Sequence, residues 1–163
     1  LQLRNETMGY LLLTTGMRAS ELLALQFSQV QEHSTNNYIE FKGKRGKWRR
    51  IPLSQKSIHL IDRLKKLMQI EGVMNPYICF NIRSKDSSIS YEALRLIAQL
   101  SSTQLTSQKN SPHWFRRSFI TKLLTNGIPL YEVMNLSGHE SITTTNAYLQ
   151  QLKKADVKAL PYD

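Results

Sequence analysis

Cysteine, acidic residues and long apolar runs are all scarce in this 163-residue chain. The single cysteine, Cys79, excludes an internal disulfide framework, argues against a zinc site built from several thiolates, and suits a reducing cytoplasm. The longest apolar stretch, around Met8 to Leu13, is far too short to span a membrane. The first ten residues also lack the basic and apolar pattern of a signal peptide. These absences favour an ordinary globular protein of the cytoplasm.

Positive charge, by contrast, is abundant. Lys and Arg number 22 against 12 Asp and Glu, which gives a formal net charge of +10. This balance favours a polyanionic partner, with nucleic acid ahead of an anionic membrane surface. Basic residues crowd one stretch in particular, namely Lys42, Lys44, Arg45, Lys47, Arg49 and Arg50. Such a run is usually a solvated loop, but this one lies between two strand-like segments, so its side chains should project in a fixed direction.

Hydrophobic periodicity predicts one mainly α-helical domain with a small antiparallel β-sheet, over residues 1–163. Strands are expected at 38–41 and 48–53 as a hairpin, joined by a short strand near Val30. Helices are expected at 6–15, 19–26, 54–70, 90–100, 111–126, 129–137 and 141–148, with an amphipathic tail helix over 150–159. The Ser-, Thr- and Gln-rich stretch 101–111 is predicted to be a loop.

Four short segments carry side chains suited to chemistry on a phosphate. Arg18 stands at the start of a predicted helix, where Glu21 three residues later can be its ion-pair partner. The segment His113-Trp114-Phe115-Arg116 places an imidazole and a guanidinium on one helix face. His139 follows a glycine, and Tyr148 comes nine residues after it. Taken singly, each has an ordinary explanation, such as a surface salt bridge for Arg18 or core packing for Tyr148.

Together these segments resemble the tyrosine recombinases, a family of phage integrases and chromosome resolvases. The family's first box has the form T-G-x-R-x-S-E-L, which stands unchanged at residues 15–22. The family's hairpin pattern, G-K-x-x-K-x-R-x-x-P-L, is matched at Gly43, Lys44, Lys47, Arg49, Pro52 and Leu53. The second box, H-x-x-R, falls on His113 and Arg116. The third, L-G-H-x-S-x-x-x-T-x-x-Y, falls on Gly138, His139, Ser141, Thr145 and Tyr148.

The resemblance implies the fold of that family's catalytic domain and a role for each matched residue. The activity would be site-specific cleavage and rejoining of DNA through a 3′-phosphotyrosine. The catalytic residues would be Arg18, Lys44, His113, Arg116, His139 and Tyr148. Glu21 would orient Arg18 or a catalytic neighbour, and a purely structural pair with another basic residue is the alternative. Residues that contact DNA would be Lys42, Arg45, Lys47, Arg49 and Arg117.

These residue types suit the reaction. The forked guanidinium groups of Arg18 and Arg116 match the non-bridging oxygens of a phosphate, and His139 would add another donor. A free phenol has a pKa of about 10 and needs a base in order to attack, for which His113 is the candidate. Lys44 would protonate the leaving 5′ oxygen. No metal or cofactor is required, and the sequence offers neither a P-loop nor a cluster of metal ligands.

The chain departs from the family's pattern at two places. The second box usually reads H-D-L-R-H, whereas this chain has Trp114 and Phe115 inside the box and Arg117 after it. Ser137 stands where a leucine is usual. The family's N-terminal DNA-clamping domain is missing, so the chain is expected to be a fragment of a longer protein.

The expected partner is double-stranded DNA, with no membrane and no small-molecule substrate, and the origin would be bacterial or phage. On DNA the family works as a homo-tetramer that exchanges a C-terminal segment, here residues 150–159, whereas without DNA a monomer is expected. Docking of that segment on its own domain remains an alternative.

Other functions stay open at this point. A type IB topoisomerase uses a similar set of residues to relax supercoils. Residues 129–149 also read as helix, turn and helix, like a DNA-binding helix-turn-helix, but the second helix offers only Asn146 for reading base edges. A metal-dependent transposase would need clustered carboxylates, and the aspartates here are few and scattered. A membrane-surface protein would want a basic amphipathic helix, whereas the basic run here is hairpin-like.

Overall fold

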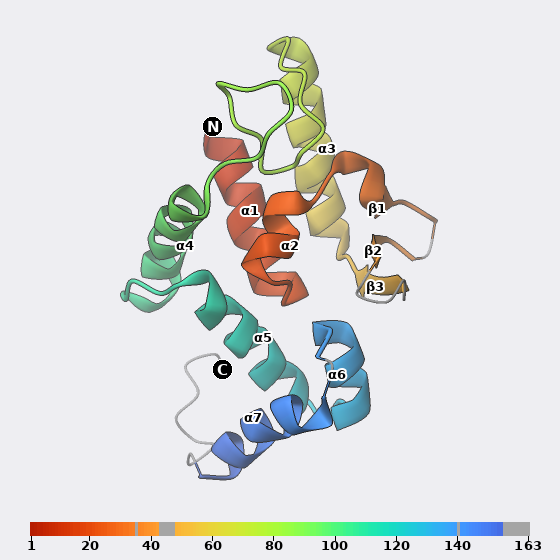
Figure 1. Ribbon diagram of the computed structural model, residues 1–163, viewed down its shortest axis with the longest axis vertical. Helices are drawn as coiled ribbons and strands as arrows, with labels where there is room; N and C mark the ends of the chain where they lie inside the picture. Colours follow the sequence, from red (N-terminus) through yellow and green to blue (C-terminus); the bar gives the residue numbers. More distant parts are fainter. Residues whose placement is uncertain (35, 43–47, 140, 155–163) are drawn as a thin grey trace.

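The computed structural model describes residues 1–34, 36–42, 48–139 and 141–154 (Figure 1). Its helices are α1 (Gln2–Thr15), α2 (Ala19–Ala24), the 3-10 turn η1 (Phe27–Gln29), α3 (Gln55–Ile70), α4 (Tyr91–Thr106), α5 (Pro112–Thr125), α6 (Leu130–Ser137) and α7 (Ile142–Lys154). Its strands are β1 (Val30–Gln31), β2 (Tyr38–Lys42) and β3 (Trp48–Pro52). No helix in these ranges is long and apolar enough to cross a membrane.

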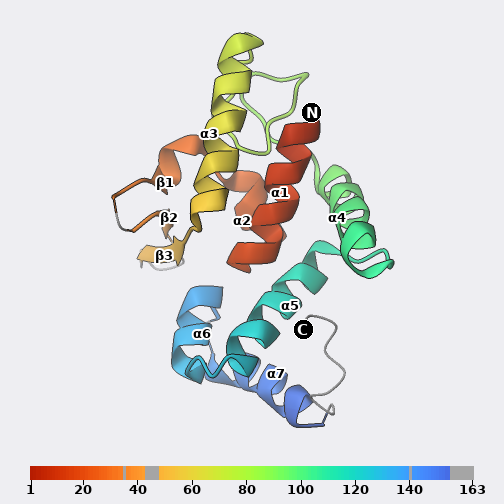
Figure 2. The same cartoon turned by 180° about the vertical axis from the view of Figure 1, so that it is seen from behind.

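Helix α1 is the centre of the domain. It packs against α3, α4 and α5, as the two opposite views show (Figures 1 and 2). The sheet lies beside the lower part of α3 in these views, while α5 leads away from α1 to α6 and α7, which form the other end of the molecule. Contacts between α6 and β3 close the domain on one side. Elements from both ends of the chain therefore meet below the C-terminal end of α1.

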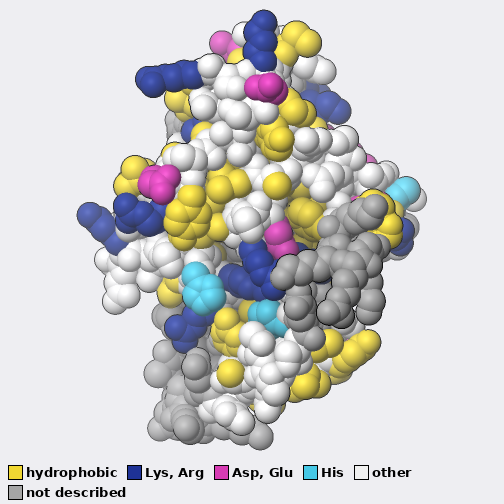
Figure 3. Space-filling model, viewed as in Figure 1, with side chains coloured by type: hydrophobic (Ala, Val, Ile, Leu, Met, Phe, Trp, Pro, Cys, Tyr) yellow, Lys and Arg dark blue, Asp and Glu magenta, His cyan; other side chains and the backbone are white. Residues whose placement is uncertain are grey.

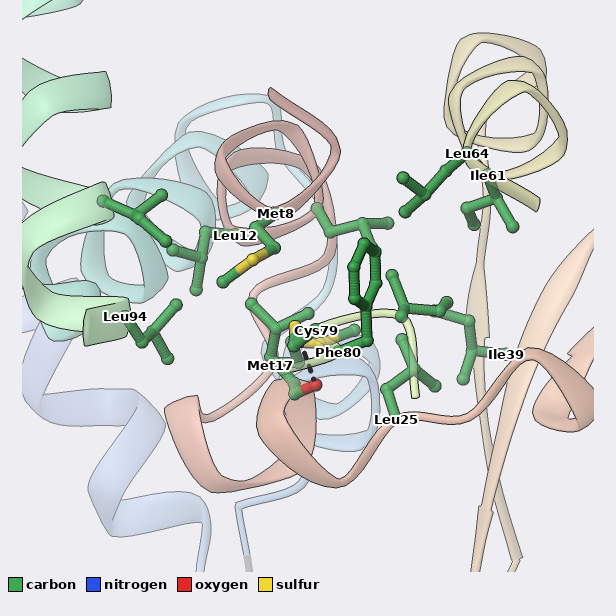
Figure 4. Close-up of a cluster of buried hydrophobic side chains, with 14 of the residues drawn as sticks. Met8, Leu12, Met17, Leu25, Ile39, Ile61, Leu64, Cys79, Phe80 and Leu94 are labelled. Carbon is green, nitrogen blue, oxygen red and sulfur yellow. Dashed lines mark hydrogen bonds between the residues drawn. The ribbon is translucent and has the colours of Figure 1, made fainter. Parts of the chain in front are cut away.

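One apolar core joins α1, α2, α3, α4 and the sheet. Met8 and Leu12 of α1 lie among Leu25, Ile39, Ile61 and Leu94, all less than 3% exposed (Figure 4). Cys79 is part of this core, and its thiol donates to the carbonyl of Leu22 at 3.3 Å. Burial raises the pKa of Cys79 to about 12, so the thiol stays protonated and acts as a packing group.

The predicted fold class and the hairpin are confirmed. The three strands are antiparallel in the order β1-β2-β3, and Val30 pairs with Ile39 of β2. Ser54 and Ser90 cap α3 and α4, because each side chain accepts a hydrogen bond from the backbone N–H three residues later. The glycines at 16, 127 and 138 lie just beyond helix ends, each with positive φ.

The predicted loop over residues 101–111 is wrong for 101–106, because α4 continues to Thr106, whereas residues 107–111 do connect α4 to α5 as a loop. The hydroxyl groups of 101–106 favour a loop in the sequence, but here they bond to carbonyls of the preceding turn. Thr103 donates to the carbonyl of Gln99 at 2.8 Å, and Thr106 donates to that of Ser102 at 3.0 Å. Ser102 is fully buried, and its hydroxyl also bonds to the carbonyl of Gln108. Back-bonding of this kind satisfies the hydroxyls without breaking the helix.

The other differences concern helix ends. Helix α1 begins four residues earlier than expected, and α2 ends at Ala24, two residues before the predicted end. Helix α7 was expected to stop near Tyr148 and a separate tail helix to follow. Instead it runs without a break to Lys154. The rest of the predicted tail helix, residues 155–159, lies outside the described residues.

The turn after α1 brings α5 close. Gly16 adopts φ 61° at the end of α1, and a Cβ there would overlap the ring of Phe119 on α5. The missing side chain therefore allows the two helices to meet at this point. It also leaves the Gly16 carbonyl close to α5, where this carbonyl accepts a hydrogen bond from Arg116.

Candidate active site

The first catalytic arginine predicted from the sequence, Arg18, sits at the N-terminus of α2. Its backbone N–H donates to Glu21 Oε2 at 2.7 Å, and its Nη1 donates to Glu21 Oε1 at 3.1 Å. The predicted ion pair is thereby confirmed. The other terminal nitrogen, Nη2, donates to the carbonyl of Gly138 at 2.7 Å, which links α2 to the end of α6. The Arg18 side chain keeps 44% exposure, so solvent or a ligand can still reach it.

The second predicted arginine, Arg116 of α5, is only 5% exposed. Its Nη1 donates to the carbonyl of Gly16 at 2.6 Å, and its Nη2 donates to the carbonyl of Ser137 at 2.7 Å. Burial lowers its pKa to about 10, and the charge of Arg18 acts in the same direction. Arg116 is nevertheless charged at neutral pH, since this pKa lies well above 7.

The C-terminal end of α6 is the meeting point of the arginines. Gly138 adopts φ 66°, and the N–H of His139 bonds to the carbonyl of Met134 at 3.1 Å, which closes the helix in a Schellman-type turn. The carbonyls of Ser137 and Gly138 are then free to accept from Arg116 and Arg18. A helix C-terminus carries partial negative charge, so it is a favourable place to gather cations.

A third guanidinium, that of Arg49 on β3, joins the same group. Its Nη1 donates to the carbonyl of Ser137 at 3.2 Å, and its Nη2 lies 3.0 Å from Glu21 Oε2. The Glu21 carboxylate therefore contacts both Arg18 and Arg49. Burial raises the pKa of this carboxyl, but the N–H of Arg18 and the positive charges of Arg49 and Arg18 outweigh burial, so the pKa lies below its ordinary value.

His139 and Tyr148 lie next to this cluster. His139 Nδ1 is 2.7 Å from the hydroxyl of buried Thr145, one turn into α7. The rings of His139 and half-buried Tyr148 are nearly parallel, with centroids 6.0 Å apart and an interplanar angle of 15°. Tyr148 also contributes to the electrostatic environment of Arg116. The helix α7 thus presents the tyrosine beside the imidazole and the arginines.

The structure brings together Arg18, Glu21, Arg116, His139 and Tyr148, as the sequence predicted. On the surface, basic and histidine side chains gather around an acidic one where the two ends of the molecule meet (Figure 3). By contrast, His113 is exposed in the first turn of α5, and within the described ranges no hydrogen bond or ion pair joins it to the cluster.

The predicted DNA-contacting residues are only partly described. Lys44, Arg45 and Lys47 fall outside the described residues, and of Lys42 only the backbone is described, at the end of β2. Arg117 is exposed on α5. Arg49, which was also predicted to contact DNA, has its guanidinium directed into the protein.

Two features of the site were missed by sequence reasoning. The backbone carbonyls of Gly16, Ser137 and Gly138 hold the arginines, and carbonyls leave no signature in a sequence. The inward position of Arg49 did have a signal, because residues 49 and 51 lie on the same face of a strand and Ile51 is apolar. The arrangement as a whole is a cationic site beside a tyrosine, which suits binding and attack of a phosphate ester.

His139 should remain neutral in the free protein down to about pH 4. Burial lowers its pKa to about 4 from 6.5, and the charges of Arg116, Arg18 and Arg49 add to this effect. Between pH 6.5, the ordinary value that applies to the unfolded chain, and about pH 4, the value in the folded protein, only the unfolded chain takes up the proton. The contribution of His139 to stability therefore falls as the pH drops from 6.5 towards 4. NMR titration of the His139 Cε1–H, assigned with a His139→Gln variant, measures this pKa directly. A midpoint near the ordinary histidine value would contradict the described environment.

Comparison with known proteins gives a consistent result. The model of the phage integrase family matches residues 1–155. The chain is 31% identical over 157 residues to the tyrosine recombinase XerD of Rhizobium meliloti (strain 1021), which covers 94% of the chain and 49% of that relative. It is 31% identical over 156 residues to XerD of Halalkalibacterium halodurans, which covers 93% of the chain and 50% of that relative. The chain therefore spans about half the length of the curated relatives it matches.

The fold agrees as well. A crystal structure of the XerH site-specific recombinase bound to difH substrate, in a pre-cleavage complex, superposes with a TM-score of 0.80 at 25% identity. The match covers 94% of the chain and 46% of XerH. The family model covers nearly all of the sequence, and the fold and the clustered motif residues point the same way. This chain belongs to the phage integrase family.

Proposed function

We propose that this chain cleaves and rejoins double-stranded DNA through a covalent bond to Tyr148, as the catalytic part of a site-specific recombinase. The observation that carries the proposal is the convergence of Arg18, Arg116 and His139 beside the Tyr148 phenol. Support comes from the relatives, which are tyrosine recombinases, and from XerH, whose structure holds a DNA substrate.

The arginines bind the phosphate and stabilise the transition state. A guanidinium has five N–H donors, so Arg116 keeps donors beyond the two given to carbonyls. Because those carbonyls fix the guanidinium in place, no reorganisation is needed as charge builds on the phosphorus. Losing one such preorganised donor typically slows a reaction by about 10²–10³-fold.

His139 contributes as a neutral donor. Its pKa of about 4 keeps the ring uncharged at neutral pH. If the Thr145 hydroxyl donates to Nδ1, the ring proton resides on Nε2, which can then donate to a phosphate oxygen. In that arrangement Thr145 would fix the tautomer of His139.

The reaction has two balanced steps. The Tyr148 oxygen attacks the phosphorus while His113 takes the phenol proton, and the bond from phosphorus to the 5′ oxygen breaks. Lys44 gives a proton to that 5′ oxygen, which leaves as a hydroxyl. A 5′-hydroxyl of another strand then attacks the phosphorus of the 3′-phosphotyrosine and gives its proton to Lys44, while the bond from phosphorus to the Tyr148 oxygen breaks and His113 returns the proton to the phenol. Contacts to neighbouring phosphates fall to Lys42, Arg45, Lys47 and Arg117, in keeping with the net charge of +10.

The recombinase also works as a homo-tetramer on DNA. Residues after Gln150 pass to a neighbouring protomer, and in sequence this segment alternates apolar Leu152, Ala155 and Val157 with Lys153 and Lys158. Such a short segment gains little helical stability alone in water, so it needs a surface to dock on.

The substitution Tyr148→Phe should abolish covalent attachment to DNA, because the attacking oxygen is lost while the ring remains. The measurement is a denaturing gel of the protein after incubation with a labelled pool of nicked duplexes with randomised cores. The matched control is Tyr131→Phe, since Tyr131 is 63% exposed on α6. An adduct that persists in the Tyr148→Phe variant would show that another group is the nucleophile.

The substitution Lys44→Ala should block cleavage of ordinary DNA and be rescued when sulfur replaces the leaving 5′ oxygen. Sulfur leaves without a proton, so the substrate bypasses a missing acid. Cleavage rates on the two substrates are compared, with Lys66→Ala of α3 as a control for lost charge. Equal defects on both substrates would make Lys44 a phosphate contact and leave Lys47 as the next candidate for the acid.

Removal of residues 151–163, all those after Gln150, should leave the fold intact and weaken cleavage and synapsis together on a substrate with two sites. Circular dichroism checks the fold, and gel electrophoresis separates complexes with one duplex from those with two. If the truncated protein unfolds, the segment is part of its own domain, and exchange between protomers is ruled out as its main role.

A further inference from the structure

Arg49 is the first inward-facing residue of β3, and Ile51 is the second. Ile51 pairs with Ile39 and Arg49 pairs with Phe41, so these four side chains share one face of the sheet. Ile39 and Ile51 on that face are buried, and the Arg49 side chain is only 15% exposed. The next residue, Arg50, lies on the opposite face with 65% exposure and pairs with Glu40. Two adjacent arginines of the same strand therefore occupy different environments.

The guanidinium of Arg49 joins two elements that are far apart in sequence. Nη2 bonds to the Glu21 carboxylate on α2, and Nη1 bonds to the Ser137 carbonyl at the end of α6. The group also lies 5.5 Å from the centre of the Phe41 ring. A Cβ on residue 138 would overlap this guanidinium, so Gly138 leaves the space that Arg49 fills.

Each acceptor of Arg49 is shared with a catalytic arginine. Glu21 Oε2 also accepts the backbone N–H of Arg18, and the Ser137 carbonyl also accepts Nη2 of Arg116. A displacement of Arg49 would thus move both acceptors against which the catalytic arginines are held. Lysine could not replace it, because one ammonium lacks the planar fork that spans two separate acceptors.

We propose that Arg49 is a positioning residue that fixes Glu21 and the end of α6 relative to each other, and so sets the geometry of Arg18, Arg116 and His139. In this role Arg49 acts by holding two acceptors of the protein, the Glu21 carboxylate and the Ser137 carbonyl, and not by contacting phosphate. This inference rests on the proposed function, and its test includes a measurement that requires no catalysis.

The first experiment separates rate from binding. Covalent adduct formation with the pool of nicked duplexes is compared for Arg49→Lys, Arg49→Gln and the control Arg50→Gln. A misplaced site typically costs about 10²-fold in rate, so both Arg49 variants should slow to this extent, whereas Arg50→Gln should not. Binding to intact duplex DNA should keep its salt dependence in all three variants, whereas loss of a phosphate contact would reduce the slope by about 0.9.

The second experiment uses NMR on the free protein. In Arg49→Lys the charge is kept, so movement of the amide resonances of Glu21, Gly138 and His139 reports lost geometry alone. In Arg49→Gln the His139 midpoint should also rise, since the Arg49 charge is one of those that lower the pKa of His139. Arg50→Gln should alter neither, and thermal unfolding confirms that every variant is folded under these conditions.

Two results would overturn the inference. One is wild-type cleavage by Arg49→Lys, which would show that a positive charge suffices. The other is unchanged amide resonances at Glu21 and Gly138 in both Arg49 variants, which would show that Arg49 positions neither element. If the wild-type protein forms no adduct with any duplex, the proposed function fails, and the resonances still decide the role of Arg49.

Discussion

The carbonyl groups at the end of α6 organise this site. Ser137 and Gly138 accept from three guanidinium groups, which reach them from α2, β3 and α5. The three arginines lie 21, 88 and 120 residues from these carbonyls in sequence, and the same two peptide groups bring them together. The partial negative charge of a helix C-terminus is typically worth about 0.3–1 kcal/mol per cation, which offsets part of the repulsion among the arginines. Glu21 supplies a full negative charge to the same cluster.

The repulsion that remains among the three arginines bears on the chemistry proposed for the site. Arg18 and Arg49 lower the pKa of Arg116, and all three lower that of His139, so the free site carries more positive charge than its own groups neutralise. Under the proposed function, a bound phosphodiester would offset this positive charge, and the pentavalent transition state, with its additional negative charge, would offset it further. Fixed donors in an electrostatically unsatisfied site are the arrangement that favours a transition state over a ground state.

The sequence was sufficient for much of this picture, since the helix caps, the hairpin and most clustered side chains follow from local patterns and from spaced motifs. It failed where the deciding partner lies elsewhere in the fold. The hydroxyls of Thr103 and Thr106 were read as a loop, because a sequence does not show that they bond to carbonyls of their own helix. Alternation along β3 already indicates that Arg49 faces inward with Ile51, but its acceptors Glu21 and Ser137 are distant in sequence and approach it only after folding.

In the turn at Gly138, the residue type can vary at position 137 but is constrained at position 138. A carbonyl is present whatever the residue at position 137, so its side chain needs only to fit a buried space. Serine meets this condition by bonding back to the Val133 carbonyl at 2.7 Å. The chain can therefore carry serine at the position where the L-G-H motif that it resembles has leucine, and still present the same acceptor. Position 138 has no such latitude, because its carbonyl depends on a backbone angle that side chains disfavour. Related sequences should accordingly vary at position 137 and keep glycine at position 138.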